Sequence, residues 1–407
     1  MEPDHALPAG TPPANAPRPD AAPPVPENVS RRITAIRWLV IAAVVFCHAM
    51  QQPYYAVNFD LSAFFRGTEL SGSLWYTVPA AFIFYGFCYG APATFAMFSG
   101  YLQFIRPRPY GETVRRRVRS LLLPLVLWTA LVCGLYMLGT AVYGNIGRFA
   151  FLRGFSPAAW FAGTVGNYVS YPAWIRGPHT GEVYQLWFLR DLFVLVLASP
   201  LIGWLMRRRG TGLAALAVFA VILHAGWRPV ICGADMLFYY SLGVFCARHG
   251  HDFFAAVDRW CPWPAVLALA AAAAWRMCGH FHDDLSAPAW LQLCALLAQL
   301  KISATIARTP RLSAWAGKLE SQAFFLYGAH AYPVLLWLSL FILPLFPLAD
   351  AWGILAASAL MFLADLGIVT AAGFAVKRFM PRVFALLTGG RPAKPRFPAA
   401  AETAGRE

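Results

Sequence analysis

Arg37 and His48 lie eleven residues apart within one apolar segment, ITAIRWLVIAAVVFCHA, which covers residues 33–49. In an α-helix eleven residues make about three turns, so both side chains lie on one face, about 16 Å apart along the axis. An ionisable group deep in a membrane helix costs at least ~2.5 kcal/mol when charged and normally faces a cavity, a partner or a reacting group. His48 is therefore predicted to be functional. Hydrogen bonding of a neutral imidazole to a neighbouring helix is the alternative.

The composition requires lipid as the solvent for much of the chain. Hydrophobic residues make up 59% of the 407 residues, charged residues make up 13%, and the mean hydropathy is +0.53. A soluble core cannot bury this much apolar surface. The formal charge of +14 comes from short Arg and Lys clusters between apolar segments. These clusters indicate membrane topology rather than a nucleic-acid surface.

An all-α, polytopic membrane protein with about ten transmembrane helices is predicted. The expected spans are 34–54, 78–105, 119–143, 184–206, 211–227, 231–248, 262–280, 288–307, 322–346 and 352–376. Basic clusters fall at alternate junctions, beginning with Arg31 and Arg32. By the positive-inside rule both termini are expected in the cytoplasm.

The remaining segments are expected to be tails and loops. Residues 1–30 are rich in Pro and Ala and are expected to form a disordered cytoplasmic tail, followed by a membrane domain over 31–380 and a second cytoplasmic tail over 381–407. The longest outward loop, 144–183, contains several aromatic residues. It is expected to serve as an acceptor platform or as an interfacial aromatic anchor. The eight cysteines show no metal-binding or redox spacing, so no metal site is predicted.

Five motifs occur in order along these spans. They are Arg37-x10-His48, FAMFSGYL at 95–102, Arg116-x-x-Arg119 before LLLP at 121–124, LWFLRDL at 186–192 and FFLYGAH at 324–330. Together they resemble the acyltransferase type 3 family of integral-membrane O-acyltransferases, over about 33–376. The resemblance implies a multi-pass enzyme of the bacterial inner membrane. It implies transfer of an acyl group, most often acetyl from acetyl-CoA, to a hydroxyl of a cell-surface or lipid-linked glycan.

The site residues suit that chemistry. Removing a proton from a sugar hydroxyl needs a base, and neutral imidazole titrates in the appropriate range. His48 is predicted to be the general base, with a covalent acyl-His48 relay as the alternative. Counted from the cytoplasmic end of its span, His48 lies about 21 Å deep. Arg37, at the cytoplasmic mouth, is expected to bind donor phosphate, or else to act as a topology charge.

A second donor contact is expected at the third span. Arg116 and Arg119 lie three residues apart and match the family's Arg-x-x-Arg motif, which predicts a phosphate clamp. The neighbouring Arg115 and Arg117 are expected to contact lipid headgroups. Ser99 and Gly100 are expected to let the backbone approach the bound acyl-CoA, or to form a turn that ends the second helix.

The acceptor is expected deeper in the membrane, where Trp187, Arg190 and Asp191 either bind the sugar or pair with neighbouring helices. Arg190 and Asp191 are placed about 10 Å from the outer surface by helix counting. His330 and Asp365 are both placed about 12 Å from the cytoplasmic side, where a hydrogen bond between them would line the donor tunnel.

Two other functions are considered. A flippase or exporter of glycan intermediates also needs many helices with polar interiors, but no internal repeat is found. A non-catalytic subunit of a polysaccharide synthase would tolerate loss of His48. The expected partners are membrane lipid, acyl-CoA, the glycan acceptor and proteins of glycan synthesis or export, with no nucleic acid. No permanently bound cofactor is expected, because acyl-CoA is a substrate.

Overall fold

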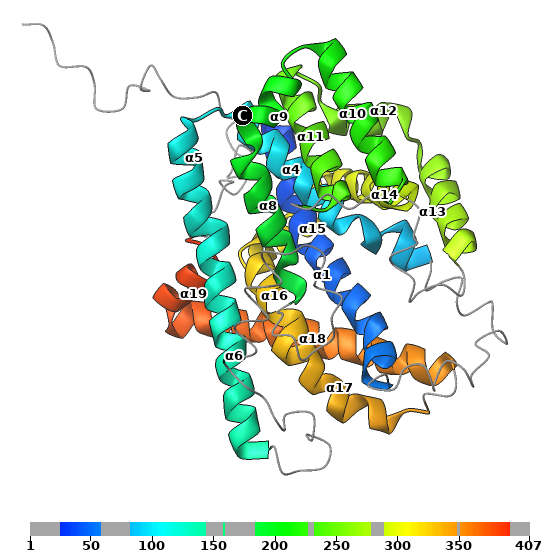
Figure 1. Cartoon of the computed structure of the whole chain (residues 1–407). Helices are drawn as coiled ribbons and strands as arrows, with labels where there is room; N and C mark the ends of the chain where they lie inside the picture. The colour runs from blue at the N-terminus through cyan, green and yellow to red at the C-terminus, as the bar shows by residue number, and fades with distance from the viewer. Residues whose placement is uncertain are drawn as a thin grey trace, which may run out of the picture.

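The structure is a computed structural model that describes residues 25–57, 82–143, 158, 184–226, 232–277, 289–347 and 351–390. The described residues are helical and contain no strand, which confirms the all-α class (Figure 1). The predicted 144–183 loop lies outside the described residues except for residue 158. The same is true of residues 1–24 and 391–407, which make up most of the two predicted tails.

The helices overlap the segments predicted from hydropathy, except for those at 110–117, 253–260, 310–320 and 381–387, which lie between or after these segments. In chain order they are α1 (Glu27–Val57), α4 (Ala91–Ile105), α5 (Tyr110–Arg117), α6 (Leu123–Tyr143), α8 (Trp187–Leu197), α9 (Ser199–Leu205), α10 (Arg209–His224), α11 (Ala234–Arg248), α12 (Phe253–Trp260), α13 (Trp263–Met277), α14 (Ala289–Arg308), α15 (Pro310–Glu320), α16 (Ala323–Ala329), α17 (Leu336–Ile342), α18 (Ala351–Phe379) and α19 (Pro381–Leu387). Short irregular turns connect several of them: η3 (Cys88–Gly90), η4 (Val118–Leu122), η7 (Tyr184–Leu186), η8 (His330–Leu335) and η9 (Leu343–Leu345).

The expected count of ten membrane spans is not confirmed. Within the described residues, five helices are long and apolar enough to cross a membrane. The pair α8 and α9, bent by 62° where Pro200 begins the second helix, makes a sixth if it is one span. The helices α10 and α13 are apolar but shorter than a full crossing. The cytoplasmic location of both termini stays a prediction.

Helix α1 runs through the middle of the bundle and contacts α4, α14, α15, α16, α17 and α18 (Figure 1). It begins at Glu27, so residues 27–30, expected within the disordered tail, are helical. Asn28 near its start donates a hydrogen bond to Asp252. Because α1 carries both Arg37 and His48, its fixed position sets the position of the predicted site.

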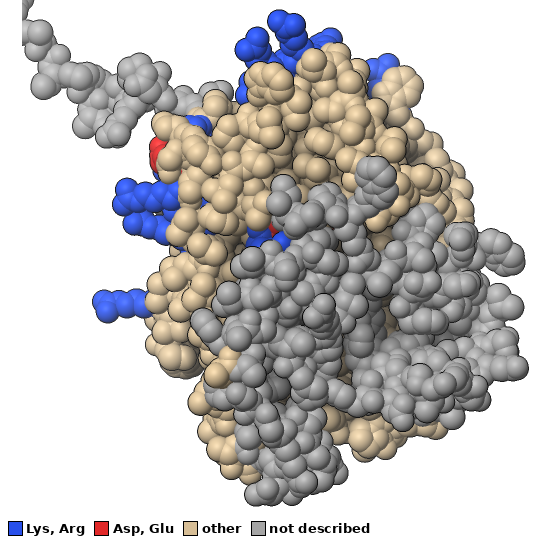
Figure 2. Space-filling model, viewed as in Figure 1, with Lys and Arg blue, Asp and Glu red and all other residues tan. Residues whose placement is uncertain are grey.

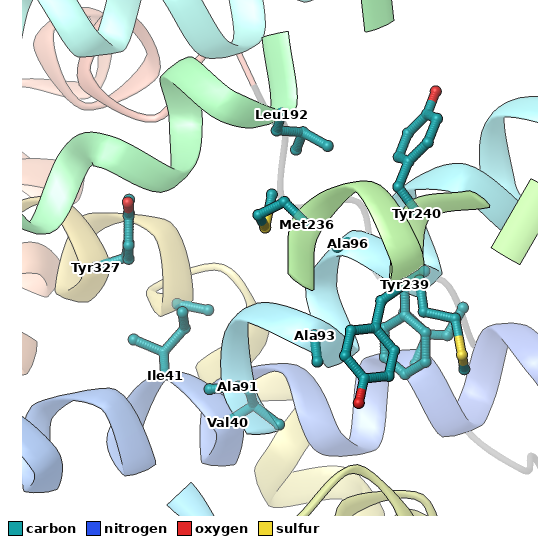
Figure 3. Close-up of a cluster of buried hydrophobic side chains, with 14 of the residues drawn as sticks. Val40, Ile41, Ala91, Ala93, Ala96, Leu192, Met236, Tyr239, Tyr240 and Tyr327 are labelled. Atoms are coloured by element: carbon teal, nitrogen blue, oxygen red, sulfur yellow. The ribbon is translucent and has the colours of Figure 1, made fainter. Parts of the chain in front are cut away.

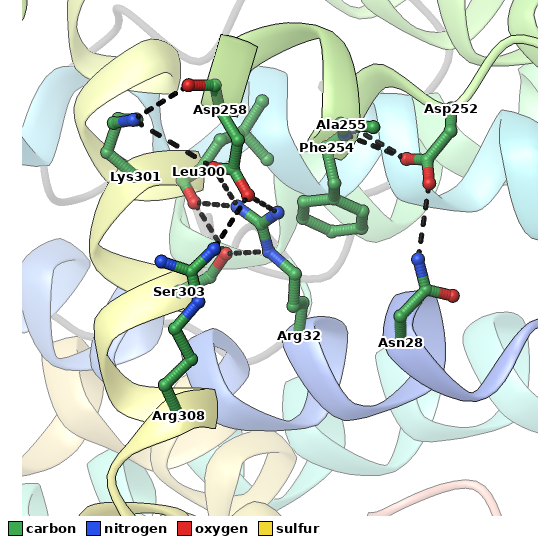
Figure 4. A network of polar contacts seen from close by, with 10 residues as sticks. All are labelled: Asn28, Arg32, Asp252, Phe254, Ala255, Asp258, Leu300, Lys301, Ser303 and Arg308. Carbon is green, nitrogen blue, oxygen red and sulfur yellow. Dashed lines mark hydrogen bonds and ion pairs between the residues drawn. The ribbon is translucent and has the colours of Figure 1, made fainter. Parts of the chain in front are cut away.

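Arg32 anchors the N-terminal part of α1 to α12 and α14 (Figure 4). Its guanidinium donates to both carboxylate oxygens of Asp258, at 2.8 and 3.1 Å, and lies 4.3 Å from the ring centroid of Phe254. It also donates to the Leu300 carbonyl and to the Ser303 hydroxyl. An arginine that only determined membrane topology would be exposed in a loop between two spans, whereas Arg32 is buried and its guanidinium is fully paired. Its role is therefore to fix the helix.

Helices α4 and α11 make the most extensive helix pair, and two glycines allow their backbones to cross closely. A Cβ at Gly100 would lie 2.2 Å from the Tyr240 carbonyl oxygen, and one at Gly243 would lie 2.1 Å from the Met97 carbonyl oxygen. Small residues at such crossings are typical of helix packing in membranes. This contact explains why Gly100 lies within α4 rather than at a turn that ends it.

The core forms where α1, α4, α8 and α11 meet. In Figure 3 the side chains of Val40, Ile41, Leu192, Met236 and Tyr239 converge on the small residues of α4. Alanines at positions 91, 93 and 96 let the other helices approach that face of α4. The interior between these helices is therefore filled by side chains.

Two π-helical turns interrupt the bundle at segments that carry predicted site residues. One is η4, which contains Arg119, and the other is η8, which begins at His330. Each lies at or just before a proline, Pro124 or Pro333, which has no N–H to continue the i→i−4 ladder. Single π turns of this kind are frequent at functional sites.

The face of the described part that is visible in Figure 2 carries no charged side chain over most of its area. Its Lys and Arg gather along α5 and where α9 meets α10. Three consecutive exposed arginines, Arg207, Arg208 and Arg209, lie at that junction. At the C-terminal end, α19 packs back on the bundle, where Phe384 is buried and the Leu387 carbonyl accepts a hydrogen bond from the Trp128 indole. The first residues of the predicted C-terminal tail thus belong to the folded domain.

Candidate active site

The His48 imidazole stacks on the His330 imidazole, with ring centroids 5.3 Å apart and planes inclined by 27°. His48 comes from α1 and His330 from the start of η8, and His330 is completely buried. Two imidazoles in contact inside a membrane protein supply acceptor and donor nitrogens at one place. The pair is the chemical centre of the candidate site.

The orientation of His330 follows from its own helix. Its Nδ1 lies 3.1 Å from the Leu326 carbonyl oxygen and 2.9 Å from the Tyr327 carbonyl oxygen. Since carbonyls only accept, Nδ1 carries the proton and the neutral ring has its lone pair on Nε2. Nε2 has no hydrogen-bond partner in the described part of the chain. His330 thus presents a fixed acceptor nitrogen beside His48.

The predicted difference in depth between His48 and His330 is wrong. Arg37 forms an ion pair with Glu320, the last residue of α15, and this contact gives the two segments a common reference point. His48 lies eleven residues beyond Arg37 on α1, about 16 Å along the axis, and the contact between the two rings places His330 at the same level. Counting from assumed membrane boundaries missed this register, because side-chain packing sets the offset between helices.

The ion pair with Glu320 therefore holds Arg37 on the same helix as His48, three turns away from the histidine pair. The side chains of Arg37 and Glu320 are 29% and 18% exposed. The guanidinium is partly exposed and already faces one carboxylate. A phosphate that binds Arg37 there has to share it with Glu320 or displace Glu320.

The start of α8 is attached to α16 beside His330. The Tyr327 hydroxyl donates a hydrogen bond to the Gln185 carbonyl, and Gln185 Nε2 donates to the Gly328 carbonyl at 3.2 Å. The Tyr327 and His330 rings lie 6.2 Å apart. Sequence reasoning missed Gln185 and Tyr327 as site residues, although Gln185 directly precedes LWFLRDL and Tyr327 lies within FFLYGAH.

Asp191 pairs with neighbouring groups of the protein. Gly233, which precedes α11, donates its backbone N–H to Asp191 Oδ2 at 2.7 Å, and Arg190 Nη1 lies 3.0 Å from Asp191 Oδ1. Asp191 is fully buried and the Arg190 side chain is 10% exposed. Of the two predicted roles, these contacts show helix pairing and do not test sugar binding. Asp235, hydrogen-bonded to Gln292 at 3.1 Å, adds a second carboxylate near Asp191 that the sequence did not single out.

Trp187, the third member of the predicted acceptor set, begins α8 and is half-buried. Its indole packs edge-on against the Phe188 ring, with centroids 6.2 Å apart. Because α8 is attached to α16 through Gln185, Trp187 lies at the end of α8 nearest that attachment.

The predicted hydrogen bond between His330 and Asp365 is absent. His330 Nδ1 is bound to backbone carbonyls, and neither Asp365 oxygen has a hydrogen-bond partner in the described residues. Asp365 lies fully buried on α18, four residues before the buried Val369 and eight before the buried Gly373. The carboxyl therefore faces the interior of the bundle without a protein partner among the described groups.

The predicted donor clamp lies at the edge of the bundle. Arg116 forms an i,i+4 ion pair with Glu112 at 2.7 Å, with side chains 58% and 43% exposed, and Arg119 is exposed in η4. Ser99 is half-buried inside α4, and Gly100 packs on α11, so neither begins a turn. Gly100 is thus a helix-packing residue in this structure.

Arg117, predicted to contact lipid headgroups, points inward instead. It is less exposed than Arg116 and Arg119 and lies close enough to Tyr240 and Arg108 to interact with them electrostatically. The reason is the helical register: one residue shifts a side chain by about 100° around the axis.

Comparison with known proteins agrees with the motifs. The family described as acyltransferase domain matches residues 31–373. This match spans most of the chain. The chain belongs to the acyltransferase type 3 family.

A relative of this acyltransferase is the "Succinoglycan biosynthesis protein ExoH" of Rhizobium meliloti (strain 1021). The two are 28% identical over 386 residues, which cover 89% of this chain and 93% of the relative. No solved structure matches the chain at a significant level.

The structure brings two of the five motifs of this acyltransferase together with Gln185, which directly precedes a third motif. The Arg37–His48 helix, the FFLYGAH segment and the residue before LWFLRDL meet around His330. The FAMFSGYL segment instead forms the α4 face that packs on α11, and the Arg116–Arg119 segment lies on the exposed edge. The two segments predicted to bind the donor are thus separate from the histidine pair.

Proposed function

We propose that this acyltransferase is a membrane O-acyltransferase that transfers an acyl group from acyl-CoA to a hydroxyl of a cell-surface or lipid-linked glycan. Acetyl from acetyl-CoA is the proposed donor group. The stacked His48–His330 pair carries the proposal, because it places a partly buried base, His48, against a fully buried histidine within the acyltransferase domain. The name of the relative, which assigns that protein to succinoglycan biosynthesis, supports a glycan acceptor.

The proposed chemistry conserves atoms and protons. The hydroxyl oxygen of the acceptor attacks the thioester carbonyl carbon, the new C–O bond forms, and the C–S bond breaks to release CoA. His48 takes the hydroxyl proton and returns it to the departing sulfur. In the alternative relay, a His48 nitrogen attacks the thioester carbonyl carbon and the C–S bond breaks to release the CoA thiolate. The acceptor hydroxyl then attacks the acyl-His48 carbonyl carbon, the C–N bond breaks, and the hydroxyl proton passes through the freed imidazole to the thiolate. Two backbone carbonyls accept from His330 Nδ1–H, and they hold the His330 ring in one tautomer beside His48.

The donor is proposed to bind from the cytoplasmic side. Arg37 offers a guanidinium at the mouth of the helix contact that leads to His48. Arg116 and Arg119 are proposed as further phosphate contacts, and their exposure allows access from the cytoplasm. Trp187, Arg190 and Asp191 are proposed to bind the acceptor, with Asp365 and His330 lining the interior.

The proposed location is the bacterial inner membrane, with both termini in the cytoplasm. A cysteine introduced at Gly166, in an otherwise cysteine-free protein, should react with an impermeant thiol reagent in intact cells whose outer membrane has been made permeable. Reaction only after the inner membrane is opened would contradict this topology.

The function is tested by comparing surface glycans from cells that carry the wild-type gene, no gene, or the His48→Gln variant. Mass spectrometry should show an acetyl mass in the wild type alone. Loss of a succinyl mass would keep the enzyme class and change the donor. Loss of the whole glycan, without any loss of an acyl group, would favour an exporter. Unchanged glycan acylation in the His48→Gln cells would favour a non-catalytic subunit.

A further inference from the structure

The turn that joins α15 to α16 contacts a residue of α1 or α18 at each of three consecutive positions. Glu320 takes the guanidinium of Arg37 from α1. The Ser321 hydroxyl accepts a hydrogen bond from Lys377 Nζ of α18 at 3.0 Å. Gln322 lies against Gly373 of α18. Two half-buried cations thus lie at this turn, and the buried Gln322 follows directly in the chain.

Gln322 is fully buried, and neither end of its amide has a hydrogen-bond partner in the described residues. A buried amide without partners is destabilising, so the great majority of such groups are satisfied. Gln299 is equally buried, but both ends of its amide make hydrogen bonds within the protein. Its Oε1 accepts from the Thr94 hydroxyl and its Nε2 donates to the Phe87 carbonyl. Gln322 has a donor and an acceptor available for a ligand.

The distance between Gln322 and the histidine pair determines the length of that ligand and the position of its polar group. Gln322 lies eight residues before His330, about 12 Å along the helix direction. Gly373 keeps α18 close to it, since a Cβ there would lie 2.3 Å from Gln322 Oε1. A molecule extending from the cations to the histidines therefore needs a negative group at one end, an amide or hydroxyl about 12 Å from its reactive end, and a narrow chain between them.

We propose that the α15–α16 turn is the entrance for the acyl donor, where Arg37 and Lys377 receive its phosphates and Gln322 hydrogen-bonds an amide of its pantetheine arm. This inference rests on the proposed function, because it takes acyl-CoA as the donor. A pantetheine arm carries two amides and a hydroxyl between its sulfur and the pyrophosphate. Gln322 matches the end of the arm farther from sulfur, and the arm leads the thioester towards His48 and His330.

Binding to the purified full-length protein tests this inference without knowledge of the acceptor. The probes are CoA and ADP, which has a pyrophosphate and no pantetheine arm. In Gln322→Leu the affinity for CoA should fall about tenfold, the effect of losing one or two hydrogen bonds, and the affinity for ADP should not change. Lys377→Ala should weaken the binding of both probes.

Gln299→Leu is the matched control. It removes an equally buried amide that the protein itself uses, so its melting temperature should fall while the folded protein keeps the wild-type ratio of CoA to ADP affinity. Gln322→Leu should melt near the wild-type temperature, since no protein group in the described residues loses a partner. Wild-type CoA affinity in Gln322→Leu, or an equal loss of affinity for both probes, would overturn the inference.

A second variant keeps the test decisive if Gln322→Leu does not fold. Gly373→Ala places a methyl group against Gln322 Oε1 and displaces the amide without removing it. It should weaken CoA binding and leave ADP binding unchanged, and unaltered CoA binding would overturn the inference. If the wild-type protein binds neither probe, the assignment of acyl-CoA as donor in the proposed function fails. If the wild type binds CoA and the variants bind it equally well, only this inference fails.

Discussion

His48 and His330 come from helices at opposite ends of the chain, and their rings stack at 5.3 Å. The contact joins a residue predicted to be catalytic to one predicted only to line a tunnel. It also places both rings at one depth in the bundle. Substitutions of the two rings are therefore expected to have different effects.

His48→Gln should abolish acyl transfer without preventing assembly. Loss of a general base typically lowers the rate by about 10²- to 10⁴-fold, whereas loss of one interhelical hydrogen bond in a membrane costs about 0.6 kcal/mol. The variant should reach the membrane at a near-normal level and still bind CoA. Glycan mass spectrometry and CoA binding measure the two properties. Near-normal glycan acylation would instead assign His48 to packing.

His330→Phe should lower kcat by about 10²-fold with little change in the KM for the donor, because it removes the fixed Nε2 acceptor and keeps a ring stacked on His48. His330→Asn, which keeps polar groups and loses the ring, serves as the comparison. Initial rates at several donor concentrations separate kcat from KM. If the Phe variant is as active as the wild type, His330 contributes only its stacked ring.

Arg37→Ala and Glu320→Gln should shift the donor KM in opposite directions. Loss of the guanidinium removes a charged hydrogen bond to phosphate and should raise KM about tenfold or more. Loss of the neighbouring carboxylate removes repulsion of the phosphate and should lower KM. A purely structural ion pair would give the same direction of change in both variants, so initial-rate kinetics distinguishes the two roles.

Arg119→Ala should weaken donor binding and make it less sensitive to salt, if the exposed cation contacts phosphate. Folding should be unaffected, because the side chain is exposed. Arg209→Ala, which removes an exposed cation at the start of α10, is the control and should leave donor binding as it is. CoA titrations at low and high salt measure the effect. Identical titrations for Arg119→Ala and the wild type would remove Arg119 from the donor site.

Gly100→Ala should destabilise the fold by about 1 to 3 kcal/mol, because the added Cβ meets the Tyr240 backbone. Gly134→Ala, on α6 with open space around the added atom, should be neutral or stabilising. Thermal unfolding in detergent compares the two. A Gly100→Ala protein with normal stability and weakened CoA binding would return Gly100 to the donor site.

The sequence alone was sufficient for properties that depend on local pattern. Hydropathy over a single segment predicts a membrane helix, and the 3.6-residue period puts Arg37 and His48 on one face, so the helical class and the position of His48 on α1 followed directly. The ordered motifs were sufficient for the family, which the match over residues 31–373 confirms. These features need no knowledge of which helices touch.

Tertiary structure decided how the helices align. The sequence placed His330 at a different depth from His48 and paired it with Asp365, because distances were counted from assumed membrane boundaries. The actual offset is set by packing between distant segments: the Arg32 anchor on α12 and α14, and the Arg37–Glu320 ion pair. Packing between distant segments also explains Gly100, which contacts the backbone of α11. It likewise explains why Gln322 could not be predicted, because its amide is buried without a partner only where the start of α16 packs against α18. The rise per residue is a local property of the backbone, whereas the register between helices depends on side chains far apart in the chain.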